Sequence, residues 1–125
     1  MEDDKERRMI AEIADSFMGR RIRDSFRLFE IPLDYLRLHY GVTDDEDVPR
    51  LTLAVVRALL AKGKRPGHFG DPDFAFWSET DGDRIVARIR REWEADGEPT
   101  LGHPICWFDW QPNFKVGWVR RNRTG

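Results

Sequence analysis

Apolar and polar residues separate most clearly near the C-terminal end of the chain, where five of its fifteen aromatic residues lie between positions 104 and 119. The turn-forming residues Gln111, Pro112 and Asn113 divide this stretch into two arms. Pairing the arms across a three-residue loop makes one face apolar and sets Asp109 opposite Lys115 on the other. Pro112 disfavours a helical conformation at Gln111, so a five-residue loop, which keeps the same face pairing, is an alternative to the three-residue loop. The pattern predicts an antiparallel hairpin whose apolar face comprises Cys106, Phe108, Trp110, Phe114, Val116 and Trp118.

Two helices are predicted in the first third of the chain from apolar residues at helical spacing. Asp3 and Asp4 can cap the first helix. Its apolar face comprises Ile10, Ile13, Ala14, Phe17 and Met18. Pro32 suits the first turn of a shorter second helix, which Gly41 ends. The Arg-rich residues 20–29 between them fit either a helix or a strand, and we expect a helix.

Two further helices are predicted in the middle of the chain. Residues 50–62 are apolar on most sides, so we expect this helix to be buried from several directions. Asp47 is placed to cap it, with Pro49 in its first turn. Residues 83–95 form an amphipathic helix with Ile85, Val86, Ile89 and Trp93 on its apolar side.

The segments between these helices complete the expected architecture. Residues 64–71 contain Pro and Gly and predict a loop, while Phe74, Phe76 and Trp77 indicate a short strand. Helices that precede a C-terminal hairpin are typical of the α+β class. We therefore expect one globular domain over residues 1–125, with several helices packed on one face of a small antiparallel sheet that includes the C-terminal aromatic hairpin.

Composition narrows the classes of function. The formal net charge of −2 gives no general attraction to nucleic acid or to an anionic membrane. The apolar runs are far shorter than the roughly 20 residues of a membrane-spanning helix. A charged N-terminus stands where a signal peptide would place an apolar segment, so we expect a cytoplasmic protein. The single cysteine, Cys106, excludes an internal disulfide bond and a zinc site built from cysteines.

The sequence carries no recognisable catalytic motif. Nucleophile motifs, the phosphate-binding loop and the dinucleotide-binding fingerprint are absent, and the three histidines lack metal-ligand spacing. We therefore expect no catalytic residues, no metal and no cofactor. A small hydrolase or nuclease is an alternative. It requires His68 or His103 to lie beside Asp71, Asp81 or Asp83 in the fold.

Two groups of charges are candidates for binding a partner. The acidic loop comprises Asp44, Asp45, Glu46 and Asp47, and we expect it to be the partner-binding patch. Complementary charge of this kind speeds the encounter with a basic protein and fixes its orientation. A nucleic-acid-binding regulator is the alternative, although the acidic total makes nucleic acid the less expected partner. It would use Arg20, Arg21, Arg23 and Arg27 with the stripe of Arg84, Arg88 and Arg91.

From about residue 51 to 119 the layout resembles small immunity proteins of bacterial toxin–immunity loci, including contact-dependent inhibition systems. The residues that carry the resemblance are Ala58-Leu59-Leu60-Ala61-Lys62-Gly63, Phe76-Trp77-Ser78, Trp107-Phe108 and Gly117-Trp118-Val119. The resemblance implies a compact α+β domain that binds and neutralises one cognate toxin without catalysis. The implied partner is a protein, most concretely a basic toxin domain, and neither a membrane nor a cofactor.

Overall fold

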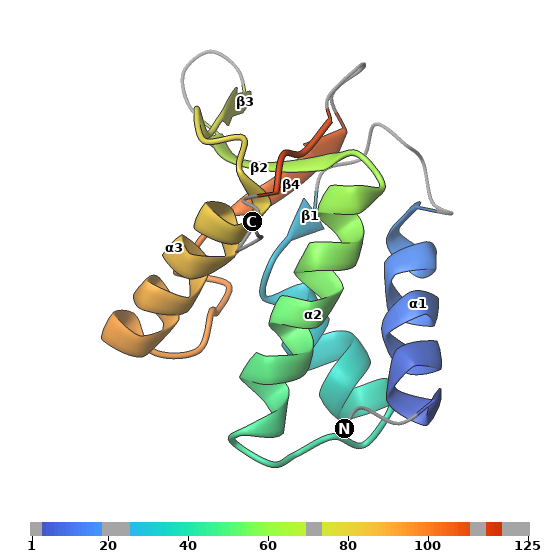
Figure 1. Cartoon of the computed structure of the whole chain (residues 1–125). Coiled ribbons are helices and arrows are strands. Elements are labelled where there is room, and N and C mark those ends of the chain that lie inside the picture. Colours follow the sequence, from blue (N-terminus) through green and yellow to red (C-terminus); the bar gives the residue numbers. More distant parts are fainter. Residues whose placement is uncertain (1–3, 19–25, 70–73, 111–114, 119–125) are drawn as a thin grey trace, which may run out of the picture.

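The computed structural model describes residues 4–18, 26–69, 74–110 and 115–118 (Figure 1). These residues form four helices and a four-stranded sheet. The helix η1 has π-type hydrogen bonding, with the Tyr40 amide donating to the Tyr35 carbonyl five residues earlier at 2.9 Å. The elements in chain order are α1 (Asp4–Met18), β1 (Phe26–Arg27), η1 (Ile31–His39), α2 (Asp47–Ala61), β2 (Lys64–Phe69), β3 (Phe74–Phe76), α3 (Gly82–Asp96) and β4 (Trp107–Trp110).

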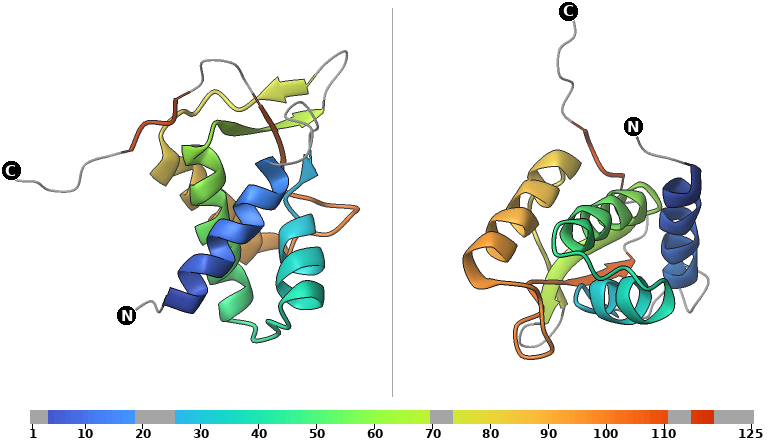
Figure 2. Two further views of the ribbon diagram at one scale, coloured as in Figure 1. Left: turned by 90° about the vertical axis from the view of Figure 1, so that its right-hand side faces the viewer. Right: turned by 90° about the horizontal axis from the view of Figure 1, so that it is seen from below.

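The sheet has the strand order β1-β4-β2-β3 and is antiparallel throughout. The helices lie together on one side of it (Figure 2). This arrangement confirms the expected α+β class. The helices predicted at the positions of α1, η1, α2 and α3 and the short strand at β3 are also present, close to their expected positions.

The C-terminal strand is present, but its partners differ from the prediction. Strand β4 lies between β1 and β2, with Phe108 opposite Phe26 on one side and Pro66 on the other. Gly117 instead forms an isolated parallel bridge with Asp81. The predicted pairing of the two arms is therefore wrong for the described residues, and the predicted turn lies outside them.

The predicted faces of this strand hold despite the change of partner. Cys106 and Phe108 are buried, whereas Trp107 and Asp109 are partly exposed on the other face. Side chains alternate along any strand, so the apolar pattern fixes the buried face without specifying the neighbouring strand.

The expected loop at residues 64–71 is also wrong, because its described part, residues 64–69, is strand β2. The carbonyl of Pro66 accepts from the Trp77 amide at 2.9 Å, on the side away from β4. The missing N–H of Pro66 therefore removes no hydrogen bond to β4. At Gly67 a Cβ atom would lie 2.4 Å from the Ala75 carbonyl oxygen, so this close strand contact needs glycine. Pro66 and Gly67, which with Gly70 suggested a loop, therefore each have a specific place in the strand, and Gly70 lies outside the described residues.

Residues 26–27 are strand β1, so the expected helix over residues 20–29 is wrong where the structure describes it. Phe26 stacks on Phe17 of α1 with ring centroids 4.1 Å apart, and on Phe108 of β4 at 5.4 Å. Aromatic packing against α1 and β4 therefore holds this short strand in place. The spacing of apolar residues along the chain cannot reveal such contacts between distant residues.

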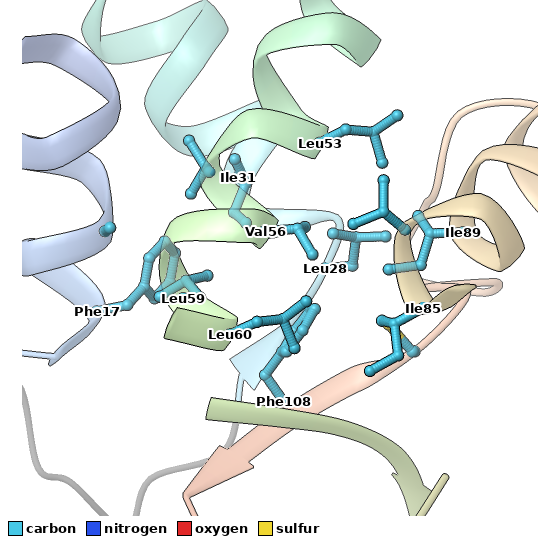
Figure 3. Packing of buried hydrophobic residues seen from close by; sticks show 14 of the residues in the cluster. Phe17, Leu28, Ile31, Leu53, Val56, Leu59, Leu60, Ile85, Ile89 and Phe108 are labelled. Atoms are coloured by element: carbon cyan, nitrogen blue, oxygen red, sulfur yellow. The ribbon is translucent and has the colours of Figure 1, made fainter. Parts of the chain in front are cut away.

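Helix α2 lies at the centre of the helical layer and contacts α1, η1, α3 and β2. This confirms the expectation that it is buried from several directions. Its inward side chains meet those of the surrounding elements in one continuous core (Figure 3). Residues of this core include Phe17, Leu28, Ile31, Val56, Leu59, Leu60, Ile85, Ile89 and Phe108.

Truncation of this central helix is expected to be costly. Leu59 is completely buried, so Leu59→Ala should lower the free energy of unfolding by about 2–5 kcal/mol through lost contacts and a residual cavity. Leu38, also helical but 74% exposed, is the matched control, and Leu38→Ala should change stability by less than about 0.5 kcal/mol. Urea titration followed by circular dichroism measures both. Equal losses in the two variants would contradict this account of the core.

Candidate functional site

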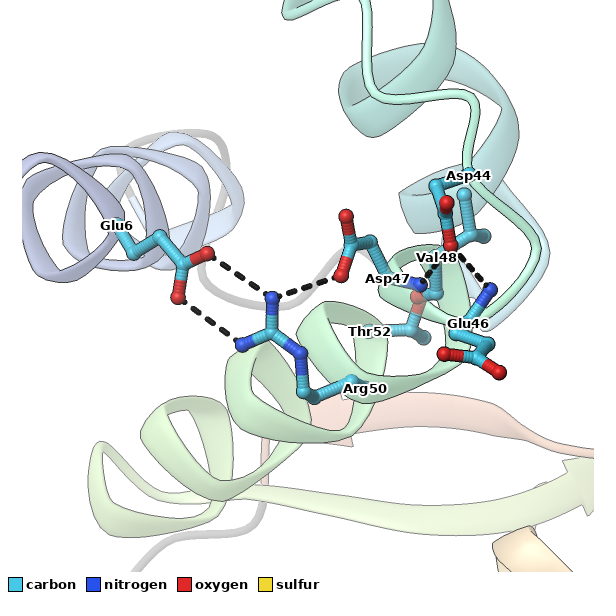
Figure 4. A network of polar contacts seen from close by, with 7 residues as sticks. All are labelled: Glu6, Asp44, Glu46, Asp47, Val48, Arg50 and Thr52. Atoms are coloured by element: carbon cyan, nitrogen blue, oxygen red, sulfur yellow. Dashed lines mark hydrogen bonds and ion pairs between the residues drawn. The ribbon is translucent and has the colours of Figure 1, made fainter. Parts of the chain in front are cut away.

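The acidic loop is shaped by one of its own carboxylates. Asp44 Oδ1 accepts hydrogen bonds from the backbone amides of Glu46 at 2.8 Å and Asp47 at 3.2 Å (Figure 4). The Asp44 carbonyl accepts from the Val48 amide at 3.0 Å. Asp44 thus satisfies amide groups at the start of α2 that have no partner within the helix. The prediction that Asp47 caps this helix is wrong, because the helix already begins at Asp47.

Asp47 instead belongs to an ion-pair network that joins two helices. Its carboxylate binds Arg50 one turn later at 3.0 Å, and Arg50 also makes a bidentate contact with Glu6 of α1, at 2.9 and 3.0 Å (Figure 4). The hydrogen bonds that Arg50 donates to Glu6 and Asp47 raise the pKa of its guanidinium. Bidentate pairing fixes the guanidinium plane, so the network orients the start of α2 against α1.

Asp45 and Glu46 remain available for binding. Both side chains are exposed, and neither makes a hydrogen bond or ion pair with the described part of the chain. Arg37 lies close enough to Asp45 for that charge to contribute to its raised pKa, but its main partner is Glu98. Of the four predicted partner-binding residues, two therefore organise the loop, and two present carboxylates that are unpaired within the described residues.

The surroundings of the loop are dominated by negative charge. Glu6 and the four loop carboxylates outnumber the cationic groups around them, which are Arg37, Arg50 and, in the pocket lined by Glu6 and Asp47, Lys5 and Arg8. The partial positive charge at the N-terminus of α2 makes this crowding of carboxylates less costly. The loop can therefore attract a cationic surface without losing its own structure.

The histidines do not assemble the alternative hydrolytic site in the described residues. The Trp77 indole donates to His68 Nδ1 at 2.9 Å, so Nε2 carries the proton that is donated to the Ile105 carbonyl at 2.8 Å. Ile105 has a φ of 66°, which is unusual for a β-branched residue. His68 therefore supports a strained bend of the backbone just before β4.

The carboxylates expected beside the histidines have other partners. Asp81 caps α3 by accepting from the amides of Asp83 and Arg84, and Asp83 pairs with Arg57 at 2.8 Å. His103 lies 3.4 Å from Asp96 on the surface, and Asp71 is outside the described residues. Among the residues that the structure describes, no group of three or more His, Cys, Asp or Glu side chains could hold a metal ion.

The two predicted basic groups are separated by the sheet where they can be located. Arg27 shares a face with Trp107, opposite the core face of Phe26 and Phe108, and its guanidinium lies 5.4 Å from the Trp107 ring. Arg88, on α3, lies 3.6 Å from the Trp77 ring and pairs with Glu92. The other three arginines of the first group, at positions 20, 21 and 23, are outside the described residues.

Sequence reasoning missed the two contacts that define the loop. The Asp44 cap had a local signal, because Asp is one of the residues preferred immediately before a helix. The pairing of Arg50 with Glu6 had none, since 44 positions separate the two residues.

Comparisons with protein-family models, curated proteins and solved structures find no match to this chain. None of the helices in the described segments is long and apolar enough to cross a membrane.

The cap makes a specific stability prediction. Asp44→Ala should cost about 0.5–2 kcal/mol, because two backbone amides lose their acceptor. Asp44→Asn should cost much less, since the amide oxygen can still accept, and Asp45→Ala is the matched control with no bond to lose. Thermal unfolding of the three variants measures the ranking. An Asp44→Ala variant as stable as Asp45→Ala would show that the loop does not depend on this cap.

Cys106 provides a test of the packing next to β4. Its side chain is completely buried, and burial together with the charge of Glu92 raises the pKa of the thiol well above its ordinary value. Alkylation of the native protein by iodoacetamide should therefore be at least about 100-fold slower than in guanidinium chloride, because reaction requires opening of the structure. Mass spectrometry over time measures both rates. Rapid native labelling would contradict the burial of this residue.

Proposed function

We propose that this protein is a non-enzymatic binding protein of the cytoplasm, an immunity protein that neutralises a bacterial toxin by covering its active site. The observation that carries the proposal is the acidic loop, in which Asp44 and Asp47 hold the backbone while Asp45 and Glu46 stay exposed. The resemblance of residues 51–119 to immunity proteins adds support.

The rigidity of the loop favours tight binding. Its backbone is bonded before any partner arrives, so little conformational freedom is lost on association. The exposed carboxylates then act as a fixed acidic feature on the end of α2. Toxins that cleave nucleic acids have basic active-site surfaces for phosphate, and such a surface complements this loop.

The proposed inhibition is steric and electrostatic. The acidic loop draws the toxin into one orientation, and the bulk of the helical layer then excludes its substrate. This mechanism requires no bond to be made or broken in either protein. Co-expression with the toxin encoded by the adjoining gene tests it, and unchanged toxicity in cells that make this protein would refute it.

The loop should act mainly on the rate of association. Asp45→Asn/Glu46→Gln should slow association with that toxin roughly 3–10-fold at low salt and by less at 0.5 M salt, where charges are screened. Folding should be unaffected, because neither side chain has a partner in the described structure. Stopped-flow fluorescence measures the rates.

The control for this experiment is Asp15→Asn, which removes a carboxylate beside Lys62 at the opposite end of α2. It should alter the association rate far less than the loop variant. If the loop variant and the parent associate at the same rate in low salt, the acidic loop is only solvated surface.

A further inference from the structure

A groove of about 400 Å³ runs between α2 and α3, on the surface that follows the acidic loop. Leu53, Ala54 and Trp93 provide apolar lining, and three cations, Arg50, Arg57 and Arg90, outnumber the one carboxylate of the lining, Glu94. Pro49 and Arg50 line the groove two and three residues after Asp47, so the groove begins in the first turn of α2, which directly follows the acidic loop in the chain.

The guanidinium groups of the groove differ in how firmly they are held. Arg50 is fixed by Glu6 and Asp47, and Arg57 by Asp83. Arg90 is exposed and makes no hydrogen bond or ion pair with the described residues. Arg90 is therefore the cation of the groove that an incoming carboxylate can pair with at the smallest cost in broken contacts.

An exposed aromatic residue extends this surface beyond Arg57. The Trp118 ring lies 5.6 Å from the Arg57 guanidinium and is 40% exposed. Its backbone segment is held by the Gly117 amide, which donates to the Thr80 carbonyl at 2.9 Å, and by the Gly82 amide, which donates to the Gly117 carbonyl at 2.5 Å. A Cβ atom on Gly82 would lie 2.2 Å from the Trp118 ring, so glycine is needed for this placement. Exposed Trp beside Arg is the composition found at energetic centres of protein interfaces.

We infer that this groove binds an acidic segment of the partner protein, with one apolar side chain in the groove and carboxylates against Arg90 and its neighbours. The inference rests on the proposed function and adds the second contact of the same interface. The acidic loop followed by a basic groove along α2 gives the interface a charge order that admits one orientation of the partner.

Apolar lining distinguishes a protein segment from nucleic acid as the occupant. A phosphate backbone gains nothing from Leu53 and Trp93, and the carboxylate of Glu94, which also lines the groove, would repel it. An amphipathic protein segment uses both parts of the groove, since apolar anchors and flanking charges occur together on such segments.

The test compares neighbouring charge reversals on α3. Arg90→Glu should weaken binding of the toxin from the adjoining gene at least tenfold, mainly through faster dissociation, because a groove contact is lost after encounter. Arg91→Glu is the matched control: it makes the same charge change on the next residue, which is exposed and does not line this groove. Surface plasmon resonance measures both, with circular dichroism to verify folding.

A second variant keeps the charge unchanged. Ala54→Gln places a longer polar side chain in the groove and should also weaken binding, at least threefold. If Arg90→Glu and Arg91→Glu bind alike while the parent binds and protects cells, the groove inference is wrong and the proposed function stands. If the parent does not bind the toxin at all, both are wrong.

The nucleic-acid outcome is tested separately with a fluorescein-labelled single-stranded oligonucleotide of twenty thymidines (about 20 phosphates). We expect no binding in fluorescence anisotropy at physiological salt. Binding that Arg90→Glu abolishes would overturn the assignment in favour of a nucleic-acid groove.

Discussion

Burial of α2 on several sides is the constraint on which the rest of the structure depends. Helices α1, η1 and α3 and strand β2 pack against it, and its apolar side chains form the middle of the core. A helix with apolar residues over most of its circumference cannot be stable beside a single layer. The neighbouring helices must therefore surround α2 on its other sides, and together with α2 they cover one face of the sheet (Figure 2).

The position of α2 also decides where the binding features lie. Its first turn carries the acidic loop, and the flank that faces α3 carries the groove. Arg50 joins the two, because it lines the groove and holds Asp47 and Glu6. A rigid buried helix is a good support for such features, since groups on packed elements keep their geometry better than groups on free loops.

The division of labour within the acidic loop follows from hydrogen bonding. Asp44 accepts from two backbone amides and Asp47 from Arg50, whereas the carboxylates of Asp45 and Glu46 are exposed and make no hydrogen bond within the described residues. Similar reasoning applies to His68, whose two ring nitrogens are occupied by Trp77 and Ile105. Polar residues that look like a chemical site in the sequence can therefore have a structural role. The groups that can bind a partner are those without such a role.

The sequence by itself determined the helices, the buried face of β4 and the location of the dense charges, because these depend on periodicity and on contacts within a few residues. It could not determine that β4 pairs with β2 and β1, since alternation specifies a face and not a neighbour. It also could not separate the loop carboxylates into bound and available ones, as Asp47 depends on Arg50 and thus on Glu6 of another helix. The groove required α2 and α3 to be packed together. Tertiary structure decided these features, because each joins residues that only the packing of the core brings together.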